Sequence, residues 1–311
     1  MSINLTNPIF HDDNAARAHL EAQRWPNGPE CPHCGEHHKN SITKLEGKAH
    51  RAGLYQCKSC REQFSVTVGT VFERSKVPLA KWVLATHLMA ASKKGMSAKQ
   101  IERMLGVTYK TAWFMMHRIR EAMAIDPKTS GPIGGDEKVV ESDETFVGGK
   151  AKNVHNFKPV PKKYPVVALI ERGGEMRIKH VADVTGDKVR DALFTLVRRE
   201  SMLMTDDAAV YHLIGKQFYC HAKVNHSAGQ YVSGEGFNHV NTAESFFAIF
   251  KRGIVGSFHS VSEAHLQRYA DEFAFRWNHR KIDDAERANE ILKASKGKRL
   301  TYRRIDQAAN A

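Results

Sequence analysis

Four of the five cysteines in this 311-residue chain form two Cys-x-x-Cys pairs, and no other feature of the sequence constrains the fold as strongly. The four are Cys31, Cys34, Cys57 and Cys60. Two residues between the thiols let both sulfurs of a tight turn bind one ion, and two such turns complete a tetrahedral zinc site. Disulfide pairing is the alternative, which a reducing cytosol disfavours. The spacing therefore predicts one structural zinc ion.

The residues around these pairs predict a zinc ribbon over residues 26–72, preceded by an N-terminal segment, residues 1–25. Between the pairs, KNSITKLEGKAHRAGLYQ alternates polar and apolar residues with turn formers, and QFSVTVGTVF continues the strand-like pattern. A module of this size has too small a core to fold by burial alone. Metal binding is therefore expected to supply much of its folding free energy.

The charge of the chain is strongly positive: 47 Lys and Arg against 34 Asp and Glu give a formal net charge of +13. This balance favours a polyanionic partner such as nucleic acid, although charge alone is weak support. No apolar run approaches the roughly 18–20 residues of a membrane span, and residues 1–23 lack the apolar core of a signal peptide. We therefore expect a cytoplasmic protein with no membrane partner.

Residues 76–126 carry the pattern of a helix-turn-helix DNA-binding region. A helical stretch from Pro78 to Lys94 precedes two helices in Met96–Met123, with a capping box at Ser97 and a turn at Gly106. The expected inward residues are Ile101, Met104 and Leu105, and the expected outward residues are Tyr109, Lys110, His117 and Arg118. The second helix of such a motif lies in the DNA major groove. A plain helical hairpin is the alternative; the basic outward face favours DNA binding.

A turn-rich linker, residues 127–138, leads into a segment that combines strand-forming residues with acids. The stretch VVESDETFVGG, Val139–Gly149, is β-branched and alternating, and it contains Glu141, Asp143 and Glu144. Carboxylates in a strand are costly to bury unless they are paired or bind metal. A divalent metal is the expected partner, with Glu144 in a supporting role because adjacent strand residues face opposite sides.

Two later segments supply further polar groups. The apolar strand SMLMTDD, which follows a pair of strands and a helix, ends in Asp206. In NTAESFFAIFKRGIVG, aromatic residues fall on one side of a helix, while Asn241, Glu244 and Lys251 fall on the other. Surface salt bridges are the alternative explanation of these acids.

Several motifs, in this order, resemble the Merlin-related insertion-sequence transposases of bacteria (ISXO type). They are the two cysteine pairs, DETFVGGK, TDDAAVY, VNHSAGQYV, HVNTAESFFAIFKRGIVGSFH and HLQRYADEFAFRWNHR, and they span about residues 31–280. The resemblance implies a multidomain α/β protein. In it, the zinc ribbon and helix-turn-helix precede an RNase H-like mixed-sheet catalytic domain, residues 139–281.

By this resemblance, Asp143 and Asp206 match the first two acids of a DDE triad, and Glu244 with Lys251 matches the acid and the basic residue of the closing helix. The chain departs from the pattern at Phe247, where relatives usually have tryptophan. Asn241 is a rival third ligand, because related groups are described with asparagine in that role. If it is not a ligand, Asn241 is expected to be the N-cap of its helix.

The activity implied is DNA transposition that depends on Mg²⁺ or Mn²⁺, which carboxylate oxygens bind well. Two ions can support in-line phosphoryl displacement, first by water to free a 3′-hydroxyl and then by that hydroxyl on target DNA. The expected partners are double-stranded element ends and target DNA, bound by a homodimer or larger assembly associated with the nucleoid. The alternatives are an inactive DNA-binding regulator and a metal-dependent nuclease without strand transfer. Residues 282–311 are predicted to be a polar, basic C-terminal tail.

Overall fold

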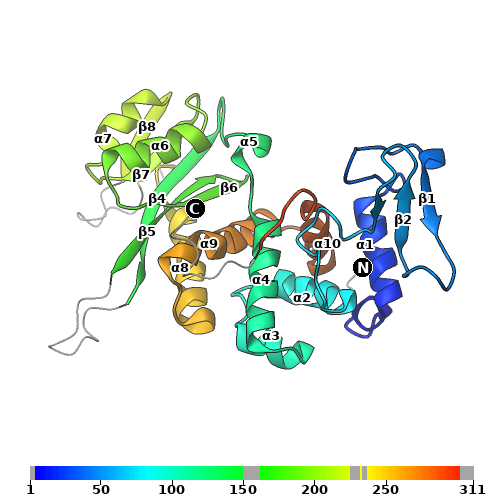
Figure 1. Cartoon of the computed structure of the whole chain (residues 1–311). Helices are drawn as coiled ribbons and strands as arrows, with labels where there is room; N and C mark the ends of the chain where they lie inside the picture. The colour runs from blue at the N-terminus through cyan, green and yellow to red at the C-terminus, as the bar shows by residue number, and fades with distance from the viewer. Residues whose placement is uncertain (1–3, 150–161, 225–231, 233–236, 302–311) are drawn as a thin grey trace, which may run out of the picture. The chain divides into compact units, whose positions relative to one another are not determined.

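The computed structural model describes residues 4–149, 162–224, 232 and 237–301 (Figure 1). The chain divides into two compact units, Met1–Met123 with Ile282–Ala311, and Ala124–Lys281. Most of the motif VNHSAGQYV lies outside the described residues, as do residues 302–311 of the predicted tail. In the described part of the chain, no helix is both long enough and apolar enough to cross a membrane.

The first unit begins with a helix and a small antiparallel sheet of order β1-β2-β3. Its elements are η1 (Pro8–Phe10), α1 (Asp13–Arg24), η2 (Lys39–Ser41), β1 (Ile42–Leu45), β2 (Leu54–Cys57) and β3 (Gln63–Phe64). Trp25, directly after α1, packs edge-on against Tyr55 and Phe64, with ring centroids 5.3 and 5.9 Å away. The predicted N-terminal segment therefore contains helix α1, and its last residue, Trp25, completes the aromatic core of the sheet.

Three helices follow: α2 (Leu79–Ala91), α3 (Ala98–Leu105) and α4 (Tyr109–Met123). The predicted capping box at Ser97 is confirmed, since its side chain accepts from the Gln100 N–H and the Gln100 side chain accepts from the Ser97 N–H. Gly106 ends α3 with φ 59°, in the left-handed region that favours glycine. Two helices separated by a turn at Gly106 are therefore present, as the helix-turn-helix prediction requires.

The predicted outward face of α4 is wrong at two of its four positions. Tyr109 and Lys110 are exposed, but His117 is fully buried and Arg118 is 6% exposed. Arg118 donates from Nη2 to the Glu73 carbonyl at 2.6 Å. Helices α2 and α10 both pack on α4, so only its beginning is left with an outward face. On α3, Met104 was predicted to face inward and is instead 57% exposed.

The predicted basic tail is also wrong over much of its length. Residues Asp284–Ala294 form helix α10, capped by Asp283, whose side chain accepts from the Glu286 N–H at 2.8 Å. Its apolar face is buried and packs on α2; the buried residues are Ala285, Ala288, Ile291 and Leu292. The end of the described chain thus completes the first unit.

The second unit contains a five-stranded mixed sheet of order β6-β5-β4-β7-β8. The strands are β4 (Val139–Gly148), β5 (Lys163–Glu171), β6 (Met176–His180), β7 (Met202–Asp206) and β8 (Cys220–Val224). β4, β5 and β6 pair antiparallel, whereas β7 pairs parallel to β4, and β8 parallel to β7. This arrangement, an antiparallel meander joined at its first strand to parallel strands, is that of RNase H-like domains.

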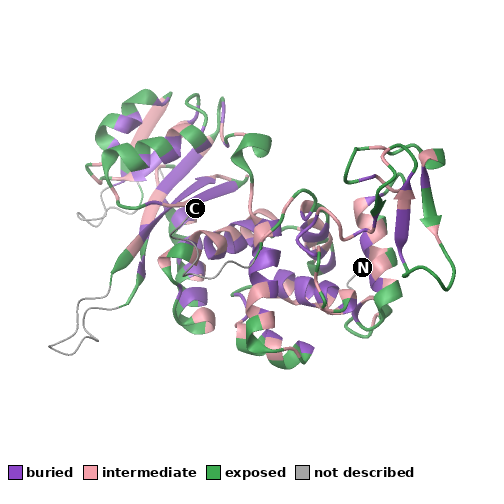
Figure 2. Ribbon diagram, viewed as in Figure 1, coloured by how far each residue is buried: buried purple, intermediate pink, exposed green. Residues whose placement is uncertain are grey.

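Helices cover both faces of this sheet (Figure 1). α8 (Asn241–Gly253), the π-helical turn Ile254–Phe258 and α9 (Glu263–Asn278) form one core with β4 and β5, in which Phe246, Phe247 and Phe250 are buried. The opposite core joins the sheet to α6 (Gly186–Leu196) and α7 (Tyr211–Ile214), and the short helix η4 (Gly215–Gln217) follows α7. Figure 2 shows the central strands largely buried between these layers.

The predicted linker, residues 127–138, packs on the second unit. It contains the short helix α5 (Pro127–Ser130) and Ile133, which is 4% exposed. Ile133 forms an isolated parallel bridge with Val197, and its N–H donates to the Leu196 carbonyl at 2.9 Å. The segment therefore extends the mixed-sheet unit towards its N-terminal side.

Candidate zinc site and candidate active site

The four predicted zinc ligands lie together, one pair in the loop between α1 and η2 and the other at the turn from β2 to β3. The Sγ atoms of Cys31, Cys34, Cys57 and Cys60 are all within 4.8 Å of one another. The Cys31–Cys60 and Cys34–Cys57 sulfur pairs are 3.6 and 3.7 Å apart. A tetrahedral ion with Zn–S bonds of about 2.3 Å needs sulfur–sulfur edges of about 3.8 Å. The four thiols thus fit one zinc ion.

Backbone N–H groups of the second turn also favour metal binding. A hydrogen bond from the Cys60 N–H lowers the pKa of Cys57 to about 7, and the Ser59 N–H acts in the same direction. A lowered pKa increases the fraction of thiolate, the form that binds metal. The pKa values of Cys34 and Cys60 are raised, so it is the geometry of the four sulfurs that agrees with the predicted structural zinc site.

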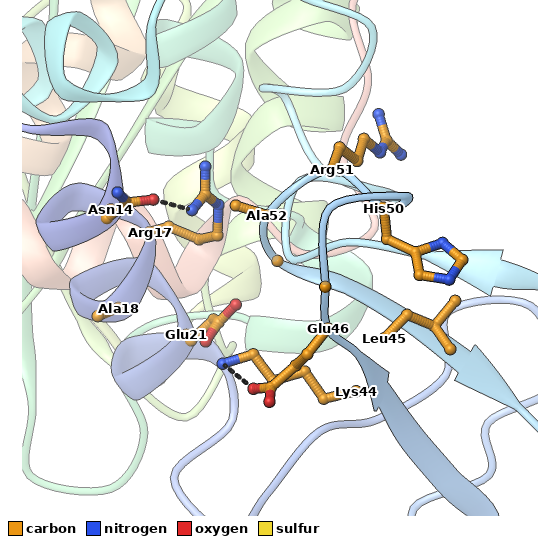
Figure 3. A pocket seen from close by; sticks show the side chains of 12 residues that line it. Asn14, Arg17, Ala18, Glu21, Lys44, Leu45, Glu46, His50, Arg51 and Ala52 are labelled. Carbon is orange, nitrogen blue, oxygen red and sulfur yellow. Dashed lines mark hydrogen bonds and ion pairs between the residues drawn. The ribbon is translucent and has the colours of Figure 1, made fainter.

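A separate cavity of about 360 Å³ lies between α1 and the loop that joins β1 to β2 (Figure 3). Its lining carries both signs of charge. Arg17 donates to the Asn14 side chain at 2.7 Å, and Lys44 lies 3.9 Å from Glu46. Because these charged side chains already interact within the helix and within the hairpin, we assign this cavity no chemical role.

Asp143 and Asp206 are brought together by the pairing of β4 with β7. The two strands run parallel, with Glu141 opposite Met204. Two residues further along each strand stand Asp143 and Asp206, on the same face as that pair because side chains alternate. Neighbouring strands lie about 4.8 Å apart. The two aspartates are therefore adjacent at the end of β7.

Glu244 lies in the first turn of α8, where its N–H donates to the Val240 carbonyl. Its charge acts on Asp143. The pKa of Asp143 is raised to about 7, chiefly by burial and in addition by the charges of Glu144, Asp206 and Glu244. Carboxylates that repel one another in this way form a site of excess negative charge. Such a site fits a divalent cation with oxygen ligands.

Asp143, Asp206 and Glu244 are near one another, but their carboxylate oxygens do not converge on one point. Among the described residues, the cysteine cluster is the one group of three or more potential ligands whose atoms all lie within 4.8 Å. Asp143 Oδ1 accepts from the Glu144 N–H at 2.8 Å, and Asp206 Oδ1 accepts from the Ala208 N–H at 3.1 Å. Each aspartate uses one oxygen in this way, and its second oxygen is a further possible metal ligand.

Asn241 and Lys251 lie on the same helix as Glu244, and both are exposed. The prediction that Asn241 caps the helix is wrong: it is the first helical residue, Val240 is the N-cap, and no side chain of that residue caps the helix. Lys251 lies two turns beyond Glu244, near the end of α8.

The other two acids of β4 have separate partners. Glu144 accepts a 2.6 Å hydrogen bond from the buried Tyr211 hydroxyl, and burial raises its pKa. Glu141 is fully buried and bonded to Arg172 and to the start of α8. The sequence shows the charge of Glu141 but does not indicate its role, because its partners lie 31 and 101 residues away.

Two family models match the chain. The ISXO2-like transposase domain matches residues 134–278, and the transposase zinc-ribbon domain matches residues 11–63, which include α1. An "Uncharacterized protein in transposable element ISH50" of Halobacterium salinarum is 30% identical over 277 residues, which cover 83% of this chain and 89% of that protein.

Two solved structures are also similar. The "Mos1 transposase paired-end complex with left transposon end" is 12% identical, with 68% of this chain and 75% of that chain covered and a TM-score of 0.28. A mariner Mos1 paired-end complex with Mg is 13% identical, with 71% and 80% covered and a TM-score of 0.26. Because the structural similarity is this low, we base no conclusion on these two structures. The two family models and the ISH50 relative show that the chain belongs to the family of ISXO2-like insertion-sequence transposases with an N-terminal zinc ribbon.

Proposed function

We propose that this transposase binds the ends of its element and catalyses metal-dependent cleavage and transfer of DNA strands. The observation that carries the proposal is the meeting of Asp143, Asp206 and Glu244, from β4, β7 and α8. Their mutual repulsion contributes to raising the pKa of Asp143 to about 7. Carboxylates that repel one another in this way are an unfavourable arrangement for stability, which supports a role in binding cations.

Each residue has a distinct task in this proposal. Asp143, Asp206 and Glu244 supply anionic oxygens for Mg²⁺ or Mn²⁺, and Lys251 contacts a phosphate near the scissile bond. When bound, two divalent ions would activate the attacking oxygen and stabilise the leaving oxygen. The nucleophile is first water and then the freed 3′-hydroxyl, so no side chain needs to form a covalent intermediate.

Glu244 is the better third ligand on two grounds. Its charge acts on Asp143, whereas Asn241 has none to contribute. Two divalent ions beside a phosphate favour anionic ligands, and the two aspartates provide only two negative charges. We therefore assign the third ligand to Glu244.

DNA recognition is assigned to the first unit. The zinc ribbon holds its fold by metal, and α4 presents Tyr109 and Lys110 at its exposed beginning, where a recognition helix contacts bases and phosphates. The net charge of +13 agrees with a DNA partner. Joining two element ends in one reaction requires at least a dimer on DNA.

The test uses purified full-length protein and duplexes that contain the DNA flanking the gene. Asp206→Asn should lose cleavage and joining while DNA binding is retained. Changing a residue that merely supports a metal ligand costs roughly 10–100-fold, so the loss of a ligand should exceed this range. Asp207→Asn is the matched control, because Asp207 is adjacent but pairs with Lys223 at 3.0 Å on the surface.

The outcomes separate the alternatives. An active Asp206→Asn protein contradicts the site. Wild-type protein that binds the ends without cutting them is a regulator, and wild-type protein that cuts without producing a joined product is a nuclease.

A further inference from the structure

The buried carboxylate of Glu141 joins β4 to the beginning of α8. Glu141 is 0% exposed, and Oε2 accepts from the Thr242 N–H at 2.8 Å and the Ala243 N–H at 3.2 Å. Oε1 accepts from the Thr242 hydroxyl at 2.9 Å. The first N–H groups of a helix have no partner within the helix. Glu141 therefore caps α8 from a strand 101 residues earlier in the chain.

Arg172 holds the other side of this carboxylate and the chain that enters α8. Its Nε donates to Glu141 Oε1 at 2.6 Å. Nη1 donates to the Phe237 carbonyl at 2.7 Å, and Nη2 donates to the His239 carbonyl at 2.8 Å. The guanidinium group thus fixes the segment immediately before the helix, while Glu141 fixes its first turn.

These contacts exclude Glu141 as a metal ligand in this arrangement. Both oxygens already accept hydrogen bonds, and the charge is balanced by Arg172 and by the positive end of the α8 dipole. A buried carboxylate with all these partners is rigidly held, because breaking any one contact leaves a buried polar group unsatisfied.

The position of Glu141 links it to the acid cluster. On β4 it precedes Asp143 by two residues, so the two share a face of the strand. On α8 it bonds Thr242 and Ala243, and Glu244 is the next residue in that turn. One carboxylate therefore connects the backbone around the first acid to the turn that carries the third.

We propose that Glu141 and Arg172 are positioning residues that set the separation of Glu244 from Asp143 and thereby the affinity for the divalent ions. The inference rests on the proposed function, since it concerns the metal that these acids bind. Glu141 acts through α8 and contacts neither metal nor DNA.

A purely electrostatic role for Glu141 is the competing explanation, and it predicts the opposite change in metal affinity for Arg172→Gln. If Glu141 acted only through its charge, removing the positive charge in Arg172→Gln would tighten metal binding. If the network positions Glu244, the same substitution should weaken binding, because the entry to α8 loses its donors. Thr242→Val changes no charge and removes one donor to Glu141, so a purely electrostatic role predicts no effect.

The experiment measures Mn²⁺ binding to full-length protein by calorimetry, together with hydrogen exchange of the first turn of α8. Changing groups that orient metal ligands typically costs about 10–100-fold in affinity. We expect about 10-fold weaker binding for Glu141→Gln and Arg172→Gln and a few-fold for Thr242→Val, each with faster exchange at residues 242–244. Thr242→Val, a neutral and nearly isosteric change, keeps the test informative if the buried-charge variants do not fold.

Glu171→Gln is the matched control. Glu171 lies on β5 and its side chain is 17% exposed; its carboxylate accepts from the Gly134 N–H and pairs with Lys138, and neither partner belongs to α8. It should lose stability without a change in Mn²⁺ affinity.

Wild-type affinity in Thr242→Val and Glu141→Gln, or tighter binding in Arg172→Gln, overturns the inference and leaves the proposed function intact. Wild-type protein that neither binds Mn²⁺ nor cleaves DNA refutes the proposed function, and the inference with it.

Discussion

At the residue scale, the two rival third ligands can be separated by substitution. Glu244→Gln should reduce strand transfer by roughly 100-fold or more, since it removes a charged ligand, while the protein stays folded. Asn241→Ala should retain most activity. Because Asn241 is not the N-cap of α8, its loss should change the free energy of unfolding by no more than about 0.5 kcal/mol. The checks are a strand-transfer assay and urea unfolding; an active Glu244→Gln with an inactive, folded Asn241→Ala would reverse the assignment.

Asp143 gives a pH-dependent prediction for the metal-free protein. Its pKa is about 7 in the folded chain against an ordinary value of 3.8, so the folded state binds the proton more tightly. This contribution to stability is full below about pH 4 and is lost as the pH rises through 7. Asp143→Asn should therefore be more stable than wild type near pH 8, by on the order of 2–4 kcal/mol, and equally stable near pH 4.

The measurement is the free energy of unfolding of both proteins, with a chelator, across this pH range. A difference that stays constant with pH would show that Asp143 is not held in an unfavourable charged state. Added Mg²⁺ at pH 8 should stabilise wild type and not Asp143→Asn, because only the former keeps its full set of ligands.

The sequence identified residues whose chemistry is local and missed those whose role depends on distant partners. Asp143 within a strand, Asp206 at the end of a strand and Glu244 on a polar helix face are visible in the sequence as candidates, and the family resemblance groups them as a triad. Glu141 could not be assigned, because Arg172 and Thr242 reach it only once the sheet and α8 have assembled.

At the element scale, the zinc ribbon should depend on metal. Purified protein is expected to contain about one zinc per chain, and Cys31→Ser should lose both the zinc and the fold of the ribbon. Elemental analysis and circular dichroism check this. Cys220→Ser is the control, since Cys220 lies on β8 in the other unit and should leave the zinc content unchanged. Zinc-free wild-type protein with a folded ribbon would contradict the site.

The sequence predicts where the helices form better than it predicts which of their residues are exposed. The capping box and Gly106 are local signals, and α3 ends where they indicate. His117 and Arg118 are buried, and both α2 and α10 pack on α4. A pattern of polar residues along one helix cannot reveal a partner that comes from the other end of the chain.

At the scale of the whole molecule, residues from the end of the described chain complete the unit formed by its beginning. Deleting residues 282–311 should expose the face of α2 that packs on Ile291 and Leu292. Burial of two such side chains contributes about 1.5–3 kcal/mol each, so the loss should exceed about 3 kcal/mol. Deleting only residues 302–311 keeps α10 and is the matched control; equal stability of both truncations would contradict the packing role of α10.

The central claim is that a freed DNA 3′-hydroxyl attacks target DNA directly, at a site built from Asp143, Asp206 and Glu244. The most direct measurement is strand transfer by the full-length protein with Mg²⁺, using a pre-cut element end that carries either a 3′-hydroxyl or a 3′-deoxy terminus. The account predicts a covalently joined product from the 3′-hydroxyl end alone, and none with Asp206→Asn. A joined product from the 3′-deoxy end, or from Asp206→Asn, would contradict it.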